Sequence, residues 1–456
     1  NLAHVLVGSE GTLGFSTQIE LKLWPLLGKR MVGACHFGSF YAAMDAAQHI
    51  VKLGPIAVEL VDRTLLDLAS DIALFRPTLD ALVRGRPEAI LLVEFAEDEA
   101  ENARRLSQLH ALMGDLGMGW DKAGASWGGV VDVLDPKLQA AVTDLRTSGL
   151  NIMMSMKEQA KPISFVEDCA VPLEHLAEYT QRLTEVFEKN GTRGTWYAHA
   201  SVGCLHVRPV LNLRQDLDVK RMRAIAEEAF QMVRDYKGSH SGEHGDGIVR
   251  SEFHEFMFGP RMVSAFKEVK AAFDPKGLFN PGKIVDAPKF DDTRFFRYGP
   301  NYKPAPMESR LDWSDYSCVG GGLQGAIEVC NNNGTCRKLA GRAMCPTYRV
   351  TRDEKDLTRG RANSLRLALS GQLGPDAFTS DEMMETLKLC VSCKGCRREC
   401  PTGVDMARLK IEVLAARAAK MGHSIRDYLV GYLPRYAPFA ARLPALPNLR
   451  DAIPGL

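Results

Sequence analysis

A run of four cysteines near the C-terminal end constrains this chain more than any other feature. It reads Cys390-Val-Ser-Cys393-Lys-Gly-Cys396-Arg-Arg-Glu-Cys400-Pro401, which is the C-x2-C-x2-C-x3-C-P spacing of a bacterial-type [4Fe–4S] site. The four thiolates have to converge on one small volume, and the proline prevents a regular helix or strand from continuing there. A zinc knot is the alternative, but the spacing favours an iron–sulfur cluster. We therefore expect one-electron transfer, with the source of the electrons elsewhere in the chain.

Three more cysteines precede this run and suggest a second cluster: Cys330, Cys336 and Cys345, the last followed by Pro346. In two-cluster ferredoxins the fourth cysteine of each run ligates the other cluster. By that rule one cluster would use Cys345, Cys390, Cys393 and Cys396. The second would use Cys330, Cys336 and Cys400, with Cys318 as the only spare thiol in this region. A single cluster with additional structural thiols stays open as the alternative.

The bulk properties exclude several classes of protein. The chain has 456 residues, too many for one hydrophobic core, so two or three domains are expected. The net charge of +1 gives no electrostatic reason to expect nucleic acid as a partner. Eight of the eleven cysteines fall between Cys318 and Cys400, which favours metal ligation in a reducing compartment over disulfides. A signal peptide and a membrane-spanning apolar run are both missing from the sequence, so a cytoplasmic location is expected.

The pattern of apolar residues predicts an α+β chain. Strands are expected at 31–37, 56–61 and 89–95, and helices at 40–53, 98–116, 173–189 and 216–236, an order that suits a ferredoxin-like unit with an antiparallel sheet. A strand, a glycine-rich turn and a second strand are expected within 2–27. Helices near 358–369, 380–389 and 406–421 should build the cysteine-rich region. The predicted segments are a terminal part of a larger domain (1–27), the α+β domain (28–285), a linker (286–317), the helical [4Fe–4S] domain (318–425) and the start of a further region (426–456), with sequence expected beyond both ends.

Two turns contain several glycines, and the first of them could approach a cofactor. The first is Gly8-Ser9-Glu10-Gly11-Thr12-Leu13-Gly14, whose backbone N–H groups suit a phosphate or a flavin edge. It lacks the G-x-G-x-x-G pattern, which makes a nicotinamide site a poor interpretation. The second contains Asn280 and Lys283 between Pro275 and Ile284, where prolines and glycines force a compact series of turns. A plain glycine-rich turn is the alternative for the first, and the second by itself indicates only a rigid loop near a domain boundary.

Two histidines and a Glu-His pair could form a metal site. His199 and His206 are separated by a potential turn around Ser201–Gly203, and a hairpin there would bring both imidazoles together. Glu243 and His244 lie in a glycine-framed loop. Two imidazoles and one carboxylate make a three-ligand catalytic metal site, which leaves His244 free as a base. Unrelated strand histidines and a solvated loop are the alternatives.

Taken together, these motifs resemble the FAD-linked D-2-hydroxyacid dehydrogenases. Val7-Gly-Ser-Glu-Gly-Thr-Leu-Gly14 is similar to the end of a flavin domain of the vanillyl-alcohol-oxidase type, and Glu243-His244-Gly with Phe279-Asn-Pro-Gly-Lys283 is similar to the substrate domain of these enzymes. The fused cysteine-rich region, with Thr358-Arg-Gly-Arg-Ala-Asn363, resembles the large bacterial FAD- and iron–sulfur-containing D-2-hydroxyglutarate dehydrogenases. The resemblance covers nearly the whole chain.

The resemblance implies roles for particular residues. The divalent metal, expected to be zinc, would be held by His199, His206 and Glu243, with His244 as the catalytic base. Arg146 and Lys161 have the spacing of the family's carboxylate-binding cations. FAD would lie against the glycine turn together with Asn280 and Lys283. The chain departs from the family at Leu150, where a threonine is usual, and at Ser201, Val202 and Cys204, so the surroundings of the metal must differ.

The implied function is FAD-dependent oxidation of a D-2-hydroxy acid, such as D-2-hydroxyglutarate or D-lactate, to the 2-oxo acid. One or two [4Fe–4S] clusters would pass the electrons to a quinone, a flavoprotein or a cytochrome. Two alternatives stay open: an electron-transfer or assembly part of a multi-subunit glycolate or lactate oxidase, and a flavin oxidase that reduces oxygen. Homo-oligomerisation and attachment at the inner face of the membrane are open as well.

Overall fold

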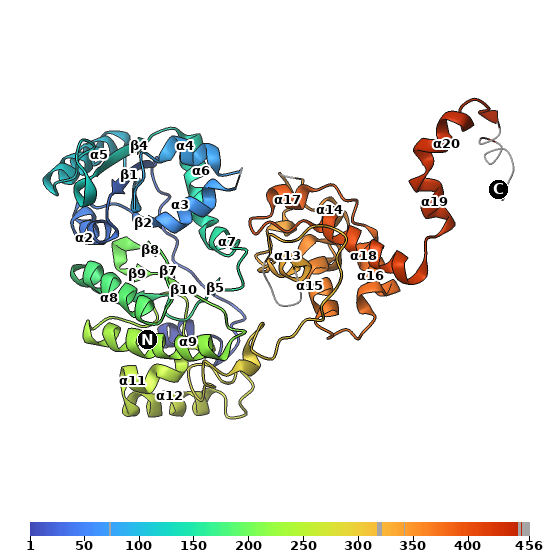
Figure 1. Cartoon of the computed structure of the whole chain (residues 1–456). Helices are drawn as coiled ribbons and strands as arrows, with labels where there is room; N and C mark the ends of the chain where they lie inside the picture. Colours follow the sequence, from blue (N-terminus) through green and yellow to red (C-terminus); the bar gives the residue numbers. More distant parts are fainter. Residues whose placement is uncertain (73, 317–321, 342, 446–447, 449–456) are drawn as a thin grey trace. The chain divides into compact units, whose positions relative to one another are not determined.

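The computed structural model describes residues 1–72, 74–316, 322–341, 343–445 and 448, and it divides into two compact units (Figure 1). The first unit comprises residues 1–303 with the short segments 331–333 and 401–403. The second comprises 304–330, 334–400 and 404–456. The division between the units falls inside the stretch 286–317, for which the sequence predicts a linker.

The first unit is built on a seven-stranded sheet in the order β4-β1-β3-β2-β8-β9-β6. The paired strands run antiparallel throughout, which confirms the predicted α+β architecture. The predicted strands at 31–37 and 89–95 have these bounds in the structure, and the third is shifted by one residue. The strands are β1 (Met31–Phe37), β2 (Ala57–Asp62), β3 (Ala89–Phe95), β4 (Gly128–Val133), β6 (Cys169–Ala170), β8 (Tyr197–His199) and β9 (Cys204–Leu205).

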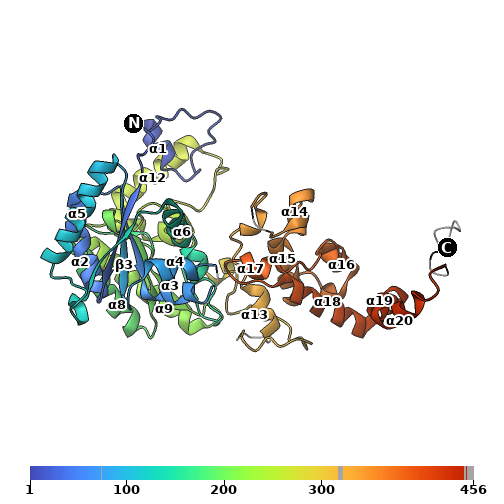
Figure 2. The same ribbon diagram turned by 90° about the horizontal axis from the view of Figure 1, so that it is seen from above.

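Both faces of this sheet are covered by helices, as the view from above shows (Figure 2). Successive side chains of a strand point to opposite faces. In β1, Cys35 and Phe37 therefore enter one core while Val32 and Ala34 enter the other. The first core is closed by α2 (Phe40–Ile50), α5 (Glu99–Asp115), α8 (Leu176–Lys189) and α9 (Asp216–Asp235), and the second by α3 (Arg63–Ser70), α4 (Arg76–Leu82), α6 (Pro136–Thr147) and α7 (Gly149–Met153).

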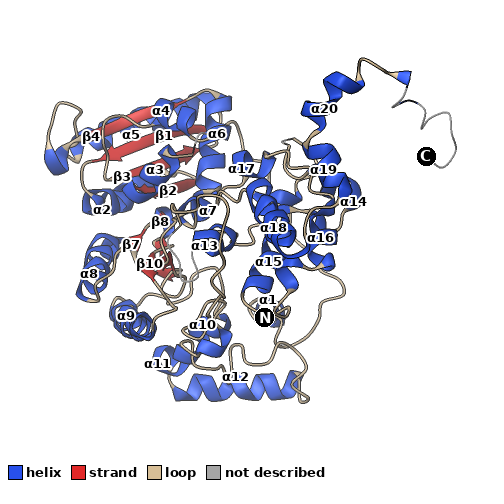
Figure 3. Ribbon diagram, turned by 45° about the vertical axis from the view of Figure 1, so that its right-hand side comes forward, coloured by secondary structure: helices blue, strands red, loops and turns tan. Residues whose placement is uncertain are grey.

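A second, three-stranded sheet has the order β5-β10-β7 (Figure 3, strands in red). It consists of β5 (Lys161–Pro162), β7 (Gly194–Thr195) and β10 (Arg208–Leu211). Because β8 and β9 belong to the large sheet, the chain between Gly194 and Leu211 contributes to both sheets. This unit also contains the helices α10 (Gly247–Arg250), α11 (His254–Phe258) and α12 (Pro260–Phe273).

The N-terminal segment differs from its prediction. Residues Leu2–Val7 form the short helix α1, capped by the Asn1 side chain, and not a strand. The alternating stretch 17–23 has no regular secondary structure, and its apolar side chains Ile19, Leu21 and Leu23 are exposed. An alternating pattern becomes a strand only when a neighbouring strand pairs with it, and the described residues give this stretch no such partner. The predicted turn at 8–14 is present, with the Thr12 N–H donating to the Ser9 carbonyl over 3.0 Å.

The second unit is helical, as predicted. Its core combines apolar side chains from most of its helices with buried cysteines, and helices occupy 358–369 and 406–421 with the predicted bounds. Among the described residues, none of the helices is long and apolar enough to cross a bilayer. The helices are α13 (Gly322–Glu328), α14 (Pro346–Thr351), α15 (Thr358–Leu369), α16 (Asp381–Lys388), α17 (Gly395–Glu399), α18 (Met406–Met421), α19 (Ile425–Gly431) and α20 (Leu433–Ala440).

Candidate active site and cysteine clusters

The hairpin predicted between His199 and His206 is present. β8 ends at His199, residues Ala200–Val202 form a single 3-10 turn, and β9 returns so that His199 lies opposite Cys204. Gly203 closes the turn in the left-handed region, with a φ of 66°. The ring centroids of His199 and His206 are 4.8 Å apart and nearly perpendicular. The turn therefore brings the two imidazoles together, as the sequence predicts.

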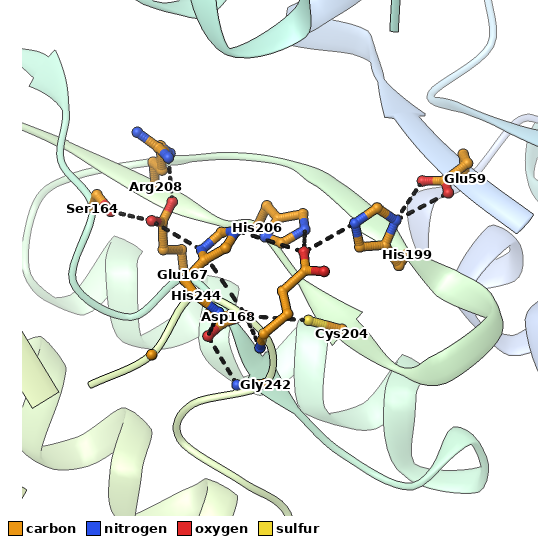
Figure 4. Close-up of polar contacts among 12 residues, drawn as sticks. Glu59, Ser164, Glu167, Asp168, His199, Cys204, His206, Arg208, Gly242 and His244 are labelled. Atoms are coloured by element: carbon orange, nitrogen blue, oxygen red, sulfur yellow. Dashed lines mark hydrogen bonds and ion pairs between the residues drawn. The ribbon is translucent and has the colours of Figure 1, made fainter. Parts of the chain in front are cut away.

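Glu243 joins the two histidines, whose rings are labelled in Figure 4 together with Glu59. Its Oε1 atom lies 3.0 Å from Nε2 of His199 and 3.0 Å from Nε2 of His206. On the far side of the first ring, Nδ1 of His199 lies 2.9 Å from the carboxylate of Glu59. We take Nδ1 as the protonated nitrogen that donates to Glu59, which leaves the Nε2 lone pair of the neutral ring facing Glu243. Two acceptor atoms at 3.0 Å require a proton or a cation between them.

His206 supplies a neutral ring to this arrangement. Its side chain is 2% exposed, and its Nδ1 atom has no hydrogen-bond partner among the described residues. Burial first, and then the electrostatic influence of the neighbouring imidazoles of His199 and His244, lowers the pKa of His206 to about 4. Glu59, by contrast, raises the pKa of His199 through its hydrogen bond. A neutral imidazole, an oriented imidazole and a carboxylate are the donors that suit a divalent cation such as zinc, so these residues fit the expected metal.

A buried aspartate that the sequence analysis missed holds the loop of Glu243. Asp168 accepts the backbone N–H groups of Gly242, Glu243 and His244 over 2.8–2.9 Å. Burial acts to raise the pKa of Asp168, but the backbone N–H groups of Glu243 and His244 outweigh it and the pKa is lowered. Cys204, where the resembling family has asparagine, lies with its sulfur 3.5 Å from this carboxylate. The ligand atoms of Asp168, His206, Glu243 and His244 all lie within 4.8 Å of one another, so the structure also offers a ligand set that differs from the predicted trio by containing Asp168 and His244 in place of His199.

His244, the predicted base, stacks on His206 with a centroid distance of 4.8 Å and an interplanar angle of 17°. Its Nδ1 atom is 3.5 Å from Glu167 and its Nε2 atom 3.5 Å from Glu243. Glu167 is buried, pairs with Arg208 at 2.5 Å and accepts a hydrogen bond from Ser164. A carboxylate beside Nδ1 favours the tautomer with the proton on that atom, so Nε2 faces Glu243 with a lone pair.

The two predicted carboxylate-binding cations have different surroundings. Arg146 lies beside the histidines: its guanidinium is 2.7 Å from Glu59 and 3.2 Å from Nδ1 of His199. Lys161 begins β5, and its ammonium group donates to the Met156 carbonyl. Leu150, where the family has threonine, lies within α7. The structure thus places Arg146 in contact with a predicted metal ligand.

The glycine turn expected at the flavin meets the Glu243 loop directly. The carboxylate of Glu10 accepts the backbone N–H groups of Asp246 and Gly247, and the amide of Asn280 donates to the Glu10 carbonyl over 2.8 Å. Glu10 and Gly11 both have positive φ angles, 52° and 69°. Of the eight predicted cofactor residues, Glu10 and Asn280 are therefore in contact with each other. Lys283 lies in the loop beyond Asn280. The other five belong to the turn itself: Gly8, Ser9, Gly11, Thr12 and Gly14.

Four cysteines of the second unit line one cavity: Cys345, Cys390, Cys393 and Cys396. Thr358 and Arg361 line it too, and the Thr358 hydroxyl is 2.9 Å from the sulfur of Cys345. The backbone N–H of Met406 donates to the sulfur of Cys396 over 3.3 Å. Hydrogen bonds to sulfur are typical of cluster ligands. The grouping is the one that the two-cluster rule predicts.

Cys330, Cys336 and Cys400 form the second predicted group. Burial first, and then the neighbouring thiols Cys345, Cys330 and Cys400, raise the pKa of Cys336 to about 12. Thiolates crowded in a buried site need a compensating cation, so both groups fit iron ligation. The ten described cysteines are all free of disulfides. Cys318, the candidate fourth ligand, lies outside the described residues.

The fold and the two sites define an α+β domain joined to a helical, cysteine-rich unit. Comparison with known families agrees: residues 28–284 match FAD linked oxidases, C-terminal domain, and residues 326–404 match the 4Fe-4S dicluster domain. The chain belongs to the FAD-linked oxidase family. The matches support FAD and iron–sulfur clusters as its cofactors.

The chain is also similar to named enzymes. It is 29% identical to D-2-hydroxyglutarate dehydrogenase of Pantoea ananatis, over 98% of this chain and 47% of that protein. The enzyme of the same name from Escherichia coli is 29% identical over 97% of this chain and 46% of its own length. D-lactate dehydrogenase of Archaeoglobus fulgidus is 29% identical, over 62% of this chain and 58% of its own. The chain thus spans about half the length of the curated relatives that it matches.

Proposed function

We propose that the protein containing this chain oxidises a D-2-hydroxy acid, D-2-hydroxyglutarate or D-lactate, to the 2-oxo acid with FAD. The observation that carries this proposal is the convergence of the His199 and His206 Nε2 atoms on Glu243, with the ring of His244 stacked 4.8 Å from His206. A metal-binding trio beside a free imidazole suits abstraction of a hydroxyl proton. The names of the relatives supply the substrate class.

His199, His206 and Glu243 would hold the divalent cation, proposed as zinc, which supplies a Lewis acid that lowers the pKa of the substrate hydroxyl. His244 then accepts the hydroxyl proton at Nε2, because its Nδ1 atom faces the carboxylate of Glu167, 3.5 Å away. FAD, when bound, supplies the acceptor for the hydride on C2.

Arg146 and Lys161 would bind the carboxylates of the substrate. Arg146 is engaged by Glu59, so its guanidinium is held in place beside His199 and does not have to be ordered when substrate binds. A planar guanidinium suits bidentate recognition of a carboxylate. A second cation favours a dicarboxylate such as D-2-hydroxyglutarate over lactate. The Gly8–Gly14 turn, Asn280 and Lys283 are proposed to contact FAD.

The cysteine groups would supply one-electron carriers for the two electrons released by each substrate. We propose that they pass these electrons to a quinone, a flavoprotein or a cytochrome, and not to NAD. A cytoplasmic site, with transient contact at the inner face of the membrane when the acceptor is a quinone, fits this role.

The test uses the full-length protein with its flavin and clusters. Anaerobic addition of D-2-hydroxyglutarate should bleach the flavin, D-lactate should do so with a higher half-saturating concentration, and L-2-hydroxyglutarate should have no effect. His244→Asn should slow bleaching by ~100-fold or more while metal content stays at the wild-type level. Bleaching by neither D-2-hydroxy acid, in protein with full flavin and metal content, would refute the proposed function.

A further inference from the structure

A second group of metal-type ligands lies around the same loop: His240, Asp246 and His254. Their ligand atoms all lie within 4.8 Å of one another. The Nε2 atom of His254 is 3.0 Å from Asp246 Oδ2, and Nε2 of His240 is 4.0 Å from Asp246 Oδ1. The two imidazoles are 1% and 2% exposed, respectively, so solvent does not explain their positions.

The hydrogen bonds of His254 fix which of its nitrogens faces the aspartate. Nδ1 lies 2.8 Å from the carbonyl oxygen of Ile284, an acceptor only, so Nδ1 carries a proton and donates it. Burial acts to lower the pKa of His254, but the hydrogen bond to Asp246 outweighs it and the pKa is raised, so Nε2, 3.0 Å from Asp246, shares a proton with the carboxylate unless a cation takes the place of that proton. This is the geometry of His199 between Glu59 and Glu243, and it too requires a proton or a cation between the two acceptors.

His240 decides between these two possibilities. Neither of its ring nitrogens makes a hydrogen bond of good geometry to a residue that the structure describes, although the backbone of Arg250 lies close enough to act on its pKa. Leaving a buried polar atom unpaired costs ~1–3 kcal/mol, so a ring with two such atoms needs a reason. Burial lowers the pKa of His240 to about 4, so the ring is neutral and offers a lone pair. The faces and edges of the ring meet Phe230 and Phe258, with centroids 5.5 Å and 5.7 Å away.

An ion pair between protonated His254 and Asp246 accounts for one contact and leaves His240 without a partner. A cation among the three side chains would bind Asp246 Oδ1, His254 Nε2 and one nitrogen of His240. It would therefore give a partner to three buried polar atoms at once. Zinc bonds of 2.0–2.1 Å place tetrahedral ligand atoms about 3.3 Å apart. The present separations, from 3.0 Å between His254 Nε2 and Asp246 to at most 4.8 Å within the group, bracket this value.

We propose that His240, Asp246 and His254 form a second, structural site for a divalent cation of the zinc type. Two imidazoles and one carboxylate are its protein ligands, and the second Asp246 oxygen or a water completes the coordination. The ligands are buried among aromatic rings, so the site is closed to substrate. His240 and Asp246 flank Gly242–Gly245, and His254 begins α11, so the cation ties both ends of the loop that carries Glu243 and His244 to that helix.

Metal counting in the purified full-length protein tests this site. After dialysis against a weak chelator, zinc and iron per chain are measured by mass spectrometry for the wild type and its variants. His254→Gln should lose about half of the tightly bound zinc, and His199→Ala about half as well, because the two sites have separate ligands. His110→Gln is the matched control: His110 pairs with Asp132 at 2.8 Å on the surface, and zinc should be unchanged.

Asp246→Asn, which preserves the side-chain volume, serves as a second variant if His254→Gln fails to fold. Anomalous diffraction from unmodified protein should give a peak at the zinc absorption edge between His240 and His254. If both variants retain all of the zinc that His199→Ala leaves behind, or if diffraction shows only water between the rings, the second site is refuted. That result leaves the His199 site untouched, since its zinc and the flavin reduction it supports are measured separately.

Discussion

Asp168→Asn isolates what the buried carboxylate contributes to the loop of Glu243. The aspartate accepts three backbone N–H groups, two at Oδ2 and one at Oδ1. Asparagine tolerates the positive φ of 71° at this position, so the backbone of residue 168 is unchanged. The amide can keep two of the acceptor contacts, but its NH2 group then faces the N–H of Glu243. A lost hydrogen bond to a charged group costs about 1.5–3 kcal/mol, and the surviving bonds weaken, so we expect a loss of about 2–4 kcal/mol in the loop.

Hydrogen exchange and zinc affinity measure this loss. The amides of Gly242, Glu243 and His244 should exchange faster by at least ~30-fold, since about 1.4 kcal/mol corresponds to a tenfold change. The zinc affinity of the His199 site should fall by ~10–100-fold. Asp98→Asn is the control: Asp98 caps α5 by accepting from Glu101, a role that asparagine fills equally well. Unchanged loop exchange and unchanged zinc affinity in Asp168→Asn would refute this account of the loop.

Three further predictions concern the clusters and the acid stability. Cys393→Ser should leave flavin reduction by substrate intact but abolish reduction of a distant acceptor, as followed in stopped-flow and steady-state assays; undiminished acceptor reduction would exclude that cysteine from the electron path. Thr358→Val removes a hydrogen bond of about 1 kcal/mol to the sulfur of Cys345, which should lower the reduction potential of one cluster by about 40 mV. An EPR redox titration measures this potential, and an unshifted value would show that the hydroxyl does not act on the cluster. The hydrogen bond from Arg223 lowers the pKa of Asp291. Their pairing therefore stabilises the fold fully at pH values above the ordinary carboxyl pKa, and this stabilisation is lost as the pH falls through the lowered pKa. Arg223→Met should therefore lower the free energy of unfolding by about 2 kcal/mol at pH 7, with the difference from wild type shrinking below about pH 4; a difference independent of pH would contradict the pairing.

The sequence was most informative where chemistry is encoded locally. The spacing of Cys390, Cys393 and Cys396 and the turn between His199 and His206 each restrict a few neighbouring residues, and the structure brings those residues together. The helices at 358–369 and 406–421 were predictable for the same reason, because an apolar stripe at helical spacing reports the buried face.

The supporting residues could not be found in this way. Asp168 meets its backbone donors across 74–76 residues, and Glu59 meets His199 across 140 residues. No local pattern distinguishes these acids from others in the chain, because their role depends on the sheet register and on loop packing. The strand predicted at 17–23 is wrong although its pattern is local, because a local preference for strand has no effect without a partner strand.

The central claim is that a divalent cation held by His199, His206 and Glu243 is required for oxidation of a D-2-hydroxy acid. The most direct test is anaerobic flavin reduction by D-2-hydroxyglutarate in full-length protein, before and after zinc removal and re-addition, with His199→Ala in parallel. The rate should fall by ~100-fold or more on zinc removal and recover with zinc in the wild type but not in the variant. Flavin reduction at the native rate in zinc-free protein, or in His199→Ala, would contradict the claim.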